Sequence, residues 1–506
     1  MELEFYHDGL EHYQLVLDTT LTQEETQEAI VPDACPDIMR ILETRAQIFL
    51  TGKQVREGMA MVSGLLRADV FYLPEDQESC VRHLEIPVTF STQTEAPGLS
   101  SSGTLLAIPR VRWAQARILN PRKVLLRADI AVEIRAYQPV TTKLCCGVKD
   151  GDSYMIQQRI LDKTTDIISA VQEKPFTFSE RIELSVQEGE KEALLFVHGE
   201  PVCTERKLIG SKMIFKGCVE LDALIRSGND LRTLHQSMSF SQIMEVSGAG
   251  ENSSCEVSVS LTDLTLEREG TSEYEVTVEL LAQAVVCEHR SLTLLSDLYS
   301  TAWNTDLVSQ PLQLHHIIEE STRSVPVREL VETTTPVRGI VQYWADLGDV
   351  HTQLEAGQPV LSAEVHLTAI YMDDAQQPQS IHKLLSVTYR GEVHEKGRCQ
   401  LSCSAPRELF LSPAAGGLEV RFSLDVCSLS CLEAQISMIS SAELIQERME
   451  GENDRPSVIL RMAAPGEELW DIAKAYGTTQ ADISAANELE DGVLPVGRML
   501  LIPGTH

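Results

Sequence analysis

Basic residues are scarce in this sequence. The chain of 506 residues has 42 Lys and Arg against 75 Asp and Glu, which gives a formal net charge of −33. A chain this acidic repels phosphate backbones and anionic lipid headgroups, so nucleic acid and bare membrane are poor partners for it. The charge suits a basic protein surface as partner, and it equally suits a role in solubility alone.

Long hydrophobic runs are also missing. No stretch reaches the roughly 18–20 apolar residues that a transmembrane helix needs. The first residues, MELEFYHDGLEHYQL, carry acids where a secretory signal needs bases, and no apolar segment follows them. We therefore expect a cytosolic protein without direct membrane insertion.

The motifs of common enzyme classes are absent. The sequence contains no G-x-x-x-x-G-K-[ST], no G-x-S-x-G and no H-E-x-x-H. The serine-rich stretch at 98–103 has the wrong spacing for a nucleophile elbow, which indicates a loop. His315 and His316 lie in an amphipathic-looking stretch, where we expect a surface or interface helix. We expect no enzyme, no catalytic residue and no cofactor.

The cysteines do not follow a disulfide or zinc pattern. Twelve cysteines in a chain of this length are not a disulfide framework, so reduced thiols are expected. Cys399 and Cys403 form one C-x-x-x-C and Cys427 and Cys431 another, whereas zinc knuckles use C-x-x-C with turn residues between the ligands. The intervening residues suit strands, which favours buried free thiols over a metal site. The pair at 145–146 lies in a loop-like region.

Internal repeats are the main positive signal. The segment VRHLEIPVTFSTQTEAPG at 81–98 returns as LRTLHQSMSFSQIMEVSG at 231–248, and part of it returns again at 387–389. The segment before it also occurs three times, starting at 61, 214 and 360, with Gly64 and Gly217 in the same place. Apolar residues alternate with polar ones in all three copies, and this period of two predicts a half-buried strand.

A later strand of the same kind follows in each repeat, near 130–136, 274–280 and 418–424. Alternating strands separated by turn-rich gaps indicate antiparallel sheets with one packed face. We therefore predict a mainly β fold of three tandem antiparallel β-sandwich-like modules. Short helices are expected within 24–43, and one long loop is expected at 91–104.

The end of the chain has a different periodicity. Alternating apolar residues at 458–462 predict a strand, and apolar residues at helical spacing from 469 to 476 predict a helix that Gly477 ends. Thr479 and Asp482 resemble a capping box for a second helix that ends near Asn487. A closing strand at 500–502 completes a small βααβ module.

This module resembles the LysM domain family. The matching segments are PG at 465–466, LWDIA at 469–473, YG at 476–477, AN at 486–487, Leu489, PVG at 495–497 and LIP at 501–503. The resemblance implies a groove for N-acetylglucosamine oligomers between the loop at 466–469 and the loop at 487–494.

The module departs from the usual LysM pattern in its charge. Where the family has Gly-Asp-Thr-Leu this chain has Gly466, Glu467, Glu468 and Leu469, and the second loop adds further acids. Residues 457–506 hold three basic and seven acidic side chains, a charge of −4. A basic protein surface gains more from such charge than a neutral sugar does. Trp470 lies within the helical pattern, so core packing is favoured over sugar stacking.

The three repeats resemble the SPOCS module of endospore-coat morphogenetic proteins. The resemblance rests on the strand pattern, on Gly64 and Gly217, and on LNPRK at 119–123. Tandem SPOCS-type repeats with one C-terminal LysM domain are the layout of the SipL- and SpoVID-like family. We accordingly divide the chain into SPOCS-like modules at 1–160, 161–305 and 306–445, a linker at 446–456, and a LysM domain at 457–506.

The resemblance implies a non-enzymatic scaffold of coat assembly in the mother-cell cytosol, at the forespore surface. It also implies that the LysM domain docks onto a SpoIVA-like coat-basement ATPase, with further coat proteins as partners. The candidate partner-binding residues of the groove are Gly466, Glu467, Glu468, Leu469, Asn487, Leu489, Asp491, Val493 and Leu494. We expect the leucines and Val493 to be apolar contacts and the acids to form a charged rim.

Two other functions remain open. A LysM domain that binds peptidoglycan would make the protein an anchor to wall or spore cortex. A generic adaptor unrelated to spores is the third possibility.

Overall fold

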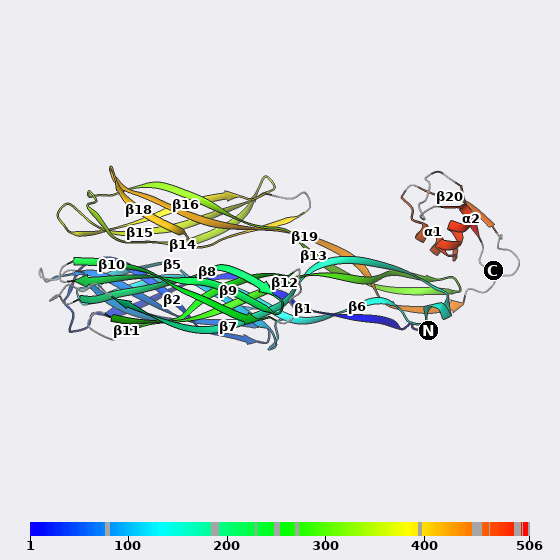
Figure 1. Cartoon of the computed structure of the whole chain (residues 1–506), viewed down its shortest axis with the longest axis horizontal. Coiled ribbons are helices and arrows are strands. Elements are labelled where there is room, and N and C mark those ends of the chain that lie inside the picture. Colours follow the sequence, from blue (N-terminus) through cyan, green and yellow to red (C-terminus); the bar gives the residue numbers. More distant parts are fainter. Residues whose placement is uncertain are drawn as a thin grey trace.

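The structure is a computed structural model. It describes residues 1–75, 81–183, 192–227, 230–246, 253–268, 273–392, 397–447, 458–464, 466–489, 497 and 499–503. Within these residues β-strands dominate, and both α-helices lie near the carboxyl terminus (Figure 1). The predicted mainly β fold is confirmed.

The same order of strands occurs three times, in what we call the first, second and third units. Each unit begins with a long strand, continues with a three-stranded sheet, and ends with another long strand. The first unit contains β1 (Phe5–Ile30), β2 (Ile38–Arg56), β3 (Met59–Pro74), β4 (Arg82–Glu95), β5 (Thr104–Asn120) and β6 (Lys123–Val148). Strands β2, β3 and β4 form the three-stranded sheet, whereas β6 pairs with both β1 and β5.

The second unit repeats this arrangement after a short 3₁₀ turn, η1 (Gly151–Tyr154). Its strands are β7 (Ile156–Glu183), β8 (Glu192–Ile209), β9 (Lys212–Ser227), β10 (Asp230–Glu245), β11 (Ser253–Arg268) and β12 (Glu273–Ser300). Strands β8, β9 and β10 form its small sheet, and β12 pairs with β7 and β11. One register contact between β1 and β7 joins the first two units into a six-stranded sheet.

The third unit has two short strands before its last one, and its long strands form a sheet separate from that of the first two units. Its strands are β13 (Trp303–Glu332), β14 (Gly339–Glu355), β15 (Gln358–Met372), β16 (Pro378–Arg390), β17 (Arg398–Cys403), β18 (Arg407–Ala414) and β19 (Gly417–Glu447). Strands β14, β15 and β16 form the small sheet, and β19 pairs with β13, β17 and β18.

Each unit is a sandwich with its own apolar core. In the first unit, Val62 and Leu66 of β3 belong to the same buried cluster as Ile130 and Ile134 of β6. Equivalent clusters join β9 to β12 in the second unit and β15 to β19 in the third. The period of two in the sequence therefore places one face of each strand in a core, as predicted.

The repeated glycine has a packing reason. A Cβ on Gly64 would lie 2.7 Å from the backbone oxygen of Phe49 and would overlap the Phe90 ring. A Cβ on Gly217 would overlap the Val202 backbone oxygen and the Phe240 ring, at the equivalent place in the second unit. Glycine is needed there because the neighbouring strand and a phenyl ring approach the backbone closely.

The helices expected within 24–43 are not present. Strand β1 continues to Ile30 and β2 begins at Ile38. Residues 24–30 pair continuously with β6, from Glu24 opposite Asp129 to the end of the strand. This long-range pairing outweighs the local helical preference of a Glu-rich segment.

Three further local expectations were wrong for the same reason. His315 and His316 lie in strand β13, not in a helix, and His315 N donates a hydrogen bond to Thr165 Oγ1 of β7 at 3.0 Å. Cys145 and Cys146 lie in β6, not in a loop. The loop expected at 91–104 is shorter, because β4 continues to Glu95.

A buried charged centre joins the three units where their small sheets meet. The guanidinium carbon of Arg45 in β2 lies 5.1 Å from the ring centroid of Phe196 in β8 and 5.0 Å from that of Trp344 in β14. Its Nη2 lies 3.3 Å from Asp222 Oδ2 in β9. One cation thus contacts both other units through cation–π and ionic interactions.

Two carboxyl groups, Glu43 of the first unit and Asp346 of the third, share this centre. Burial raises the pKa of each to about 7. The Arg45 charge partly opposes this rise for Asp346. The junction of the units is therefore sensitive to protonation.

The distal ends of the six long strands form a shared arm. Its core contains Leu10, Leu144, Leu294, Leu314 and Met438, which come from β1, β6, β12, β13 and β19. Figure 1 shows this arm extending from the sandwiches to the end of the molecule where the C-terminal module lies.

Candidate functional site

The C-terminal module has the predicted βααβ order. It consists of β20 (Val458–Met462), α1 (Leu469–Tyr476), α2 (Gln480–Asn487) and β21 (Met499–Pro503), with β20 antiparallel to β21. Gly477 ends α1 with a φ of 68°. Thr479 Oγ1 accepts a hydrogen bond from Asp482 N at 3.0 Å, so the expected N-cap of α2 is confirmed.

Both acids of the first groove loop are engaged within the chain. Gly466 turns the backbone with a φ of 83°. Glu467 accepts a hydrogen bond from Ala464 N at 2.9 Å and forms an ion pair with Arg461. Glu468 precedes α1 as its N-cap residue without a side-chain capping bond, and it forms an ion pair with Arg159 of β7.

The other described groove residues hold the module together. Leu469 is buried in its core, and Leu489 packs half-buried against the same core. Asn487 Nδ2 donates to Ile483 O at 2.8 Å and to Leu501 O at 2.6 Å, and its Oδ1 accepts from Leu501 N at 2.7 Å. Asn487 therefore fastens α2 to β21. Three further predicted site residues, Asp491, Val493 and Leu494, lie outside the described residues.

The module is docked on the end of β12. Tyr299 of β12 belongs to the apolar core of the module and stacks edge-on against Trp470, with the ring centroids 4.9 Å apart. The Tyr299 hydroxyl donates to Thr478 O at 2.8 Å. Asp297 accepts a hydrogen bond from Trp470 Nε1 at 2.7 Å and forms an ion pair with Lys474 at 2.6 Å.

This docking site was not predicted from the sequence. Trp470 is 5% exposed, as core packing predicts, but a distant strand supplies part of its surroundings. Asp297 and Tyr299 lie near the end of β12, where the register with β7 shifts between Leu295 and Asp297, and no sequence motif marks them. Asp297 and Tyr299 contact α1 only because the tertiary fold places the end of β12 against that helix.

The cysteines of the third unit are free thiols on neighbouring strands. Cys399 and Cys403 lie in β17, opposite Ser430 and Val426 of β19, so each is one position out of register with Cys431 or Cys427 of that strand. Burial raises the pKa of Cys403 to about 11 and also raises the pKa of Cys427 and Cys431. In the described part of the chain, no group of three or more His, Cys, Asp or Glu side chains is arranged to hold a metal ion.

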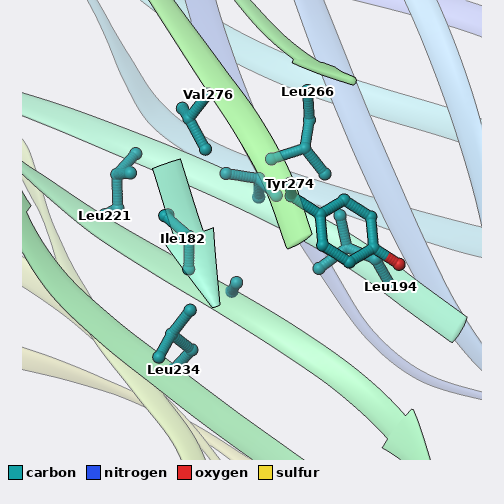
Figure 2. Close-up of a pocket in the computed structure, with 9 residues that line it drawn as sticks. Ile182, Leu194, Leu221, Leu234, Leu266, Tyr274 and Val276 are labelled. Atoms are coloured by element: carbon teal, nitrogen blue, oxygen red, sulfur yellow. The ribbon is translucent and has the colours of Figure 1, made fainter. Parts of the chain in front are cut away.

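An apolar pocket lies inside the second unit. Figure 2 shows Leu221, Leu234, Ile182 and Val276 around it, with Tyr274 at one side. Its walls come from strands that also form the core of this unit. The lining is aliphatic apart from the side chain of Tyr274.

None of the helices among the described residues is long and apolar enough to cross a membrane.

Comparisons with known families identify two kinds of domain. The LysM domain matches residues 464–503, which contain α1, α2 and β21. The SipL SPOCS domain matches residues 37–119 and 192–269, which correspond to the small sheets of the first two units with the strands that follow them. The third unit has the same strand order outside the matched residues. No curated protein and no solved structure matches the chain. The chain thus carries SPOCS domains of the SipL type followed by a C-terminal LysM domain.

Proposed function

We propose that this protein is a non-enzymatic scaffold of endospore coat assembly. The observation that carries the proposal is the presence of SipL-type SPOCS domains and a LysM domain in one chain. Both are binding domains without catalytic chemistry of their own. The function then consists of holding other proteins in place at the forespore surface, in the mother-cell cytosol.

The LysM domain is the proposed docking module for a SpoIVA-like coat-basement ATPase. Its contacts with Asp297 and Tyr299 support this role, because they give the domain a fixed orientation at the end of the arm. A polymeric partner would offer many equivalent sites, so weak single contacts add up to firm attachment. The three units would bind further coat proteins.

The groove is the proposed contact site for the ATPase. Its described acids, Glu467 and Glu468, each have a cation within the chain, and a basic partner would compete with Arg461 and Arg159 for them. Among the apolar groove residues that the structure describes, Leu489 is the one whose side chain is half-exposed. We therefore expect Leu489→Ala combined with Leu494→Asp to weaken capture of the purified ATPase in a two-protein pull-down.

Deletion of residues 457–506 tests the wider role in cells. A fluorescent fusion of the full chain should surround the forespore during sporulation, whereas the truncated fusion should be spread through the mother cell. Normal localisation of the truncated fusion would show that the SPOCS units, and not the LysM domain, attach the protein.

Peptidoglycan binding is the second candidate, and the LysM match itself favours it. The position of Trp470 argues against sugar stacking, because its ring packs on Tyr299. Co-sedimentation of the full chain with insoluble peptidoglycan separates the two functions. Sedimentation that N-acetylglucosamine oligomers compete away would establish the second function in place of docking to the ATPase.

A further inference from the structure

The two faces of the β20–β21 sheet differ in what covers them. One face is packed against the helices, and Leu500 and Ile502 are fully buried there. The other face, which we call the outer sheet face, is formed by three cross-strand pairs. These pairs are Val458 with Pro503, Leu460 with Leu501, and Met462 with Met499.

The outer sheet face is apolar and open to solvent. Val458 is 48% exposed, Leu460 64%, Met462 61% and Met499 55%. A sheet that packs on one side normally carries polar residues on its other side. Four large apolar side chains on this face are therefore accessible to another molecule.

The size of the outer sheet face indicates the strength of its contacts. Two paired five-residue strands give a face about 16 Å long and about 10 Å wide, from the rise of a strand and the spacing of its neighbours. Stable one-to-one interfaces bury about 1,200–2,000 Å² in total, which such a face cannot supply alone. It therefore suits a partner that presents many copies of one binding segment.

The charge of the domain indicates the chemistry of that segment. The described residues of the domain include five acids, namely Glu467, Glu468, Asp471, Asp482 and Glu488. The described cations, Arg461 and Lys474, already form ion pairs with Glu467 and Asp297. Glu468 is likewise paired, with Arg159 of β7. The charge that favours a basic partner and opposes a second copy of this acidic chain therefore comes from Asp471, Asp482 and Glu488, on and beside the helices.

We propose that the outer sheet face binds a coat-protein segment whose apolar side chains stand between Lys or Arg residues. This inference rests on the proposed docking function and adds a surface to it, on the sheet and away from the groove. Leu460 and Met499 provide the apolar contact, because they belong to neighbouring pairs on the two strands. The acids of the domain accelerate association with the basic segment.

The experiment measures binding of the full chain to the purified coat-basement ATPase, polymerised with ATP on a biosensor surface. Leu460→Asp combined with Met499→Asp should weaken binding about tenfold or more, because apolar burial is lost and a charge is buried instead. Leu460→Ser combined with Met499→Gln is the milder variant and should weaken binding in the same direction. Leu460→Met should bind as the wild-type chain does.

A matched control lies elsewhere in the molecule. Leu354 of β14 is 77% exposed, so Leu354→Asp places the same charge at an exposed leucine outside the LysM domain. Binding of this variant should equal that of the wild-type chain. Near-ultraviolet circular dichroism of Trp470 and its neighbours shows whether each variant keeps the domain folded.

The outcomes separate this inference from the proposed function. A wild-type chain that fails to bind the ATPase overturns the docking function and this inference with it. Full binding by folded outer-face variants overturns the inference and leaves the docking function standing. A change in the oligomeric state of these variants, with ATPase binding unchanged, would assign the face to a second copy and also overturn the inference. Selective weakening by the outer-face variants alone supports it.

Discussion

Trp470 Nε1 donates a hydrogen bond to Asp297 Oδ2 at 2.7 Å, although 173 residues separate the two in the sequence. The other oxygen of the same carboxylate accepts from Lys474 at 2.6 Å. A single side chain of β12 therefore holds two consecutive turns of α1. The LysM domain is consequently a fixed part of the arm and presents its groove and its outer sheet face in defined directions.

Asp297→Ala should release the LysM domain from β12. The variant loses two charge-assisted hydrogen bonds, each worth about 1.5–3 kcal/mol, and leaves the indole N–H of Trp470 without its acceptor. Tryptophan fluorescence should shift to longer wavelength, and limited proteolysis should separate the domain sooner. Asp306→Ala, at an exposed aspartate of β13, serves as the control and should change neither. An unaltered spectrum for Asp297→Ala would show that the docking contributes little.

Asn487→Ala should unfold the LysM domain and spare the three units. The substitution removes three hydrogen bonds and leaves the partly buried N–H and C=O groups of Leu501 in β21 without their Asn487 partner. A fully buried group left unsatisfied costs about 1–3 kcal/mol, which is the upper limit for each of these two. Calorimetry should show a separate early transition for the domain. Glu488→Ala is a neighbouring control at an exposed residue and should melt as the wild-type protein does.

Gly217→Ala should destabilise the second unit by several times the usual cost of a surface substitution. A methyl group there would overlap the backbone oxygen of Val202, and a paired backbone strand cannot move aside cheaply. Gly210→Ala is a different kind of control, because a Cβ there meets no atom within 4 Å and the cost is limited to its positive φ. Urea denaturation compares the two, and equal midpoints would contradict the packing argument.

The junction of the units should weaken as pH rises. Glu43 and Asp346 have ordinary pKa values of 4.5 and 3.8, and burial raises both to about 7 in the folded protein. The folded state therefore holds protons that the unfolded state has lost. Their stabilising contribution is complete below about pH 4 and is lost as the pH passes through about 7.

Glu43→Gln combined with Asp346→Asn isolates this effect. The free energy of unfolding of the wild-type protein should fall relative to the double variant between pH 5 and pH 8. The comparison of the two proteins removes the contributions of the other titrating groups, which both share. A difference that stays constant across this range would mean that neither carboxyl has a raised pKa.

Much of the fold follows from local patterns. Alternation in segments such as 62–72 predicts which residues of β3 face the core, and the return of Gly64 as Gly217 reveals the repeat. The LysM helices and the Thr479 N-cap can also be predicted from the sequence, because the residues that indicate them lie within a few positions of one another. Patterns failed where pairing partners are far away: the Glu-rich end of β1 and the His315 segment each became strands through long-range pairing.

The sequence by itself determined the β class, the threefold repetition and the identity of the terminal domain, because hydrophobic period and turn residues act over short distances. Only the tertiary structure decided that Arg45 joins three units and that Asp297 holds Trp470. Such contacts depend on how sheets pack on one another. Residues such as Arg45 and Asp297 therefore have roles that depend on side chains from distant strands, which only this packing brings into contact with them.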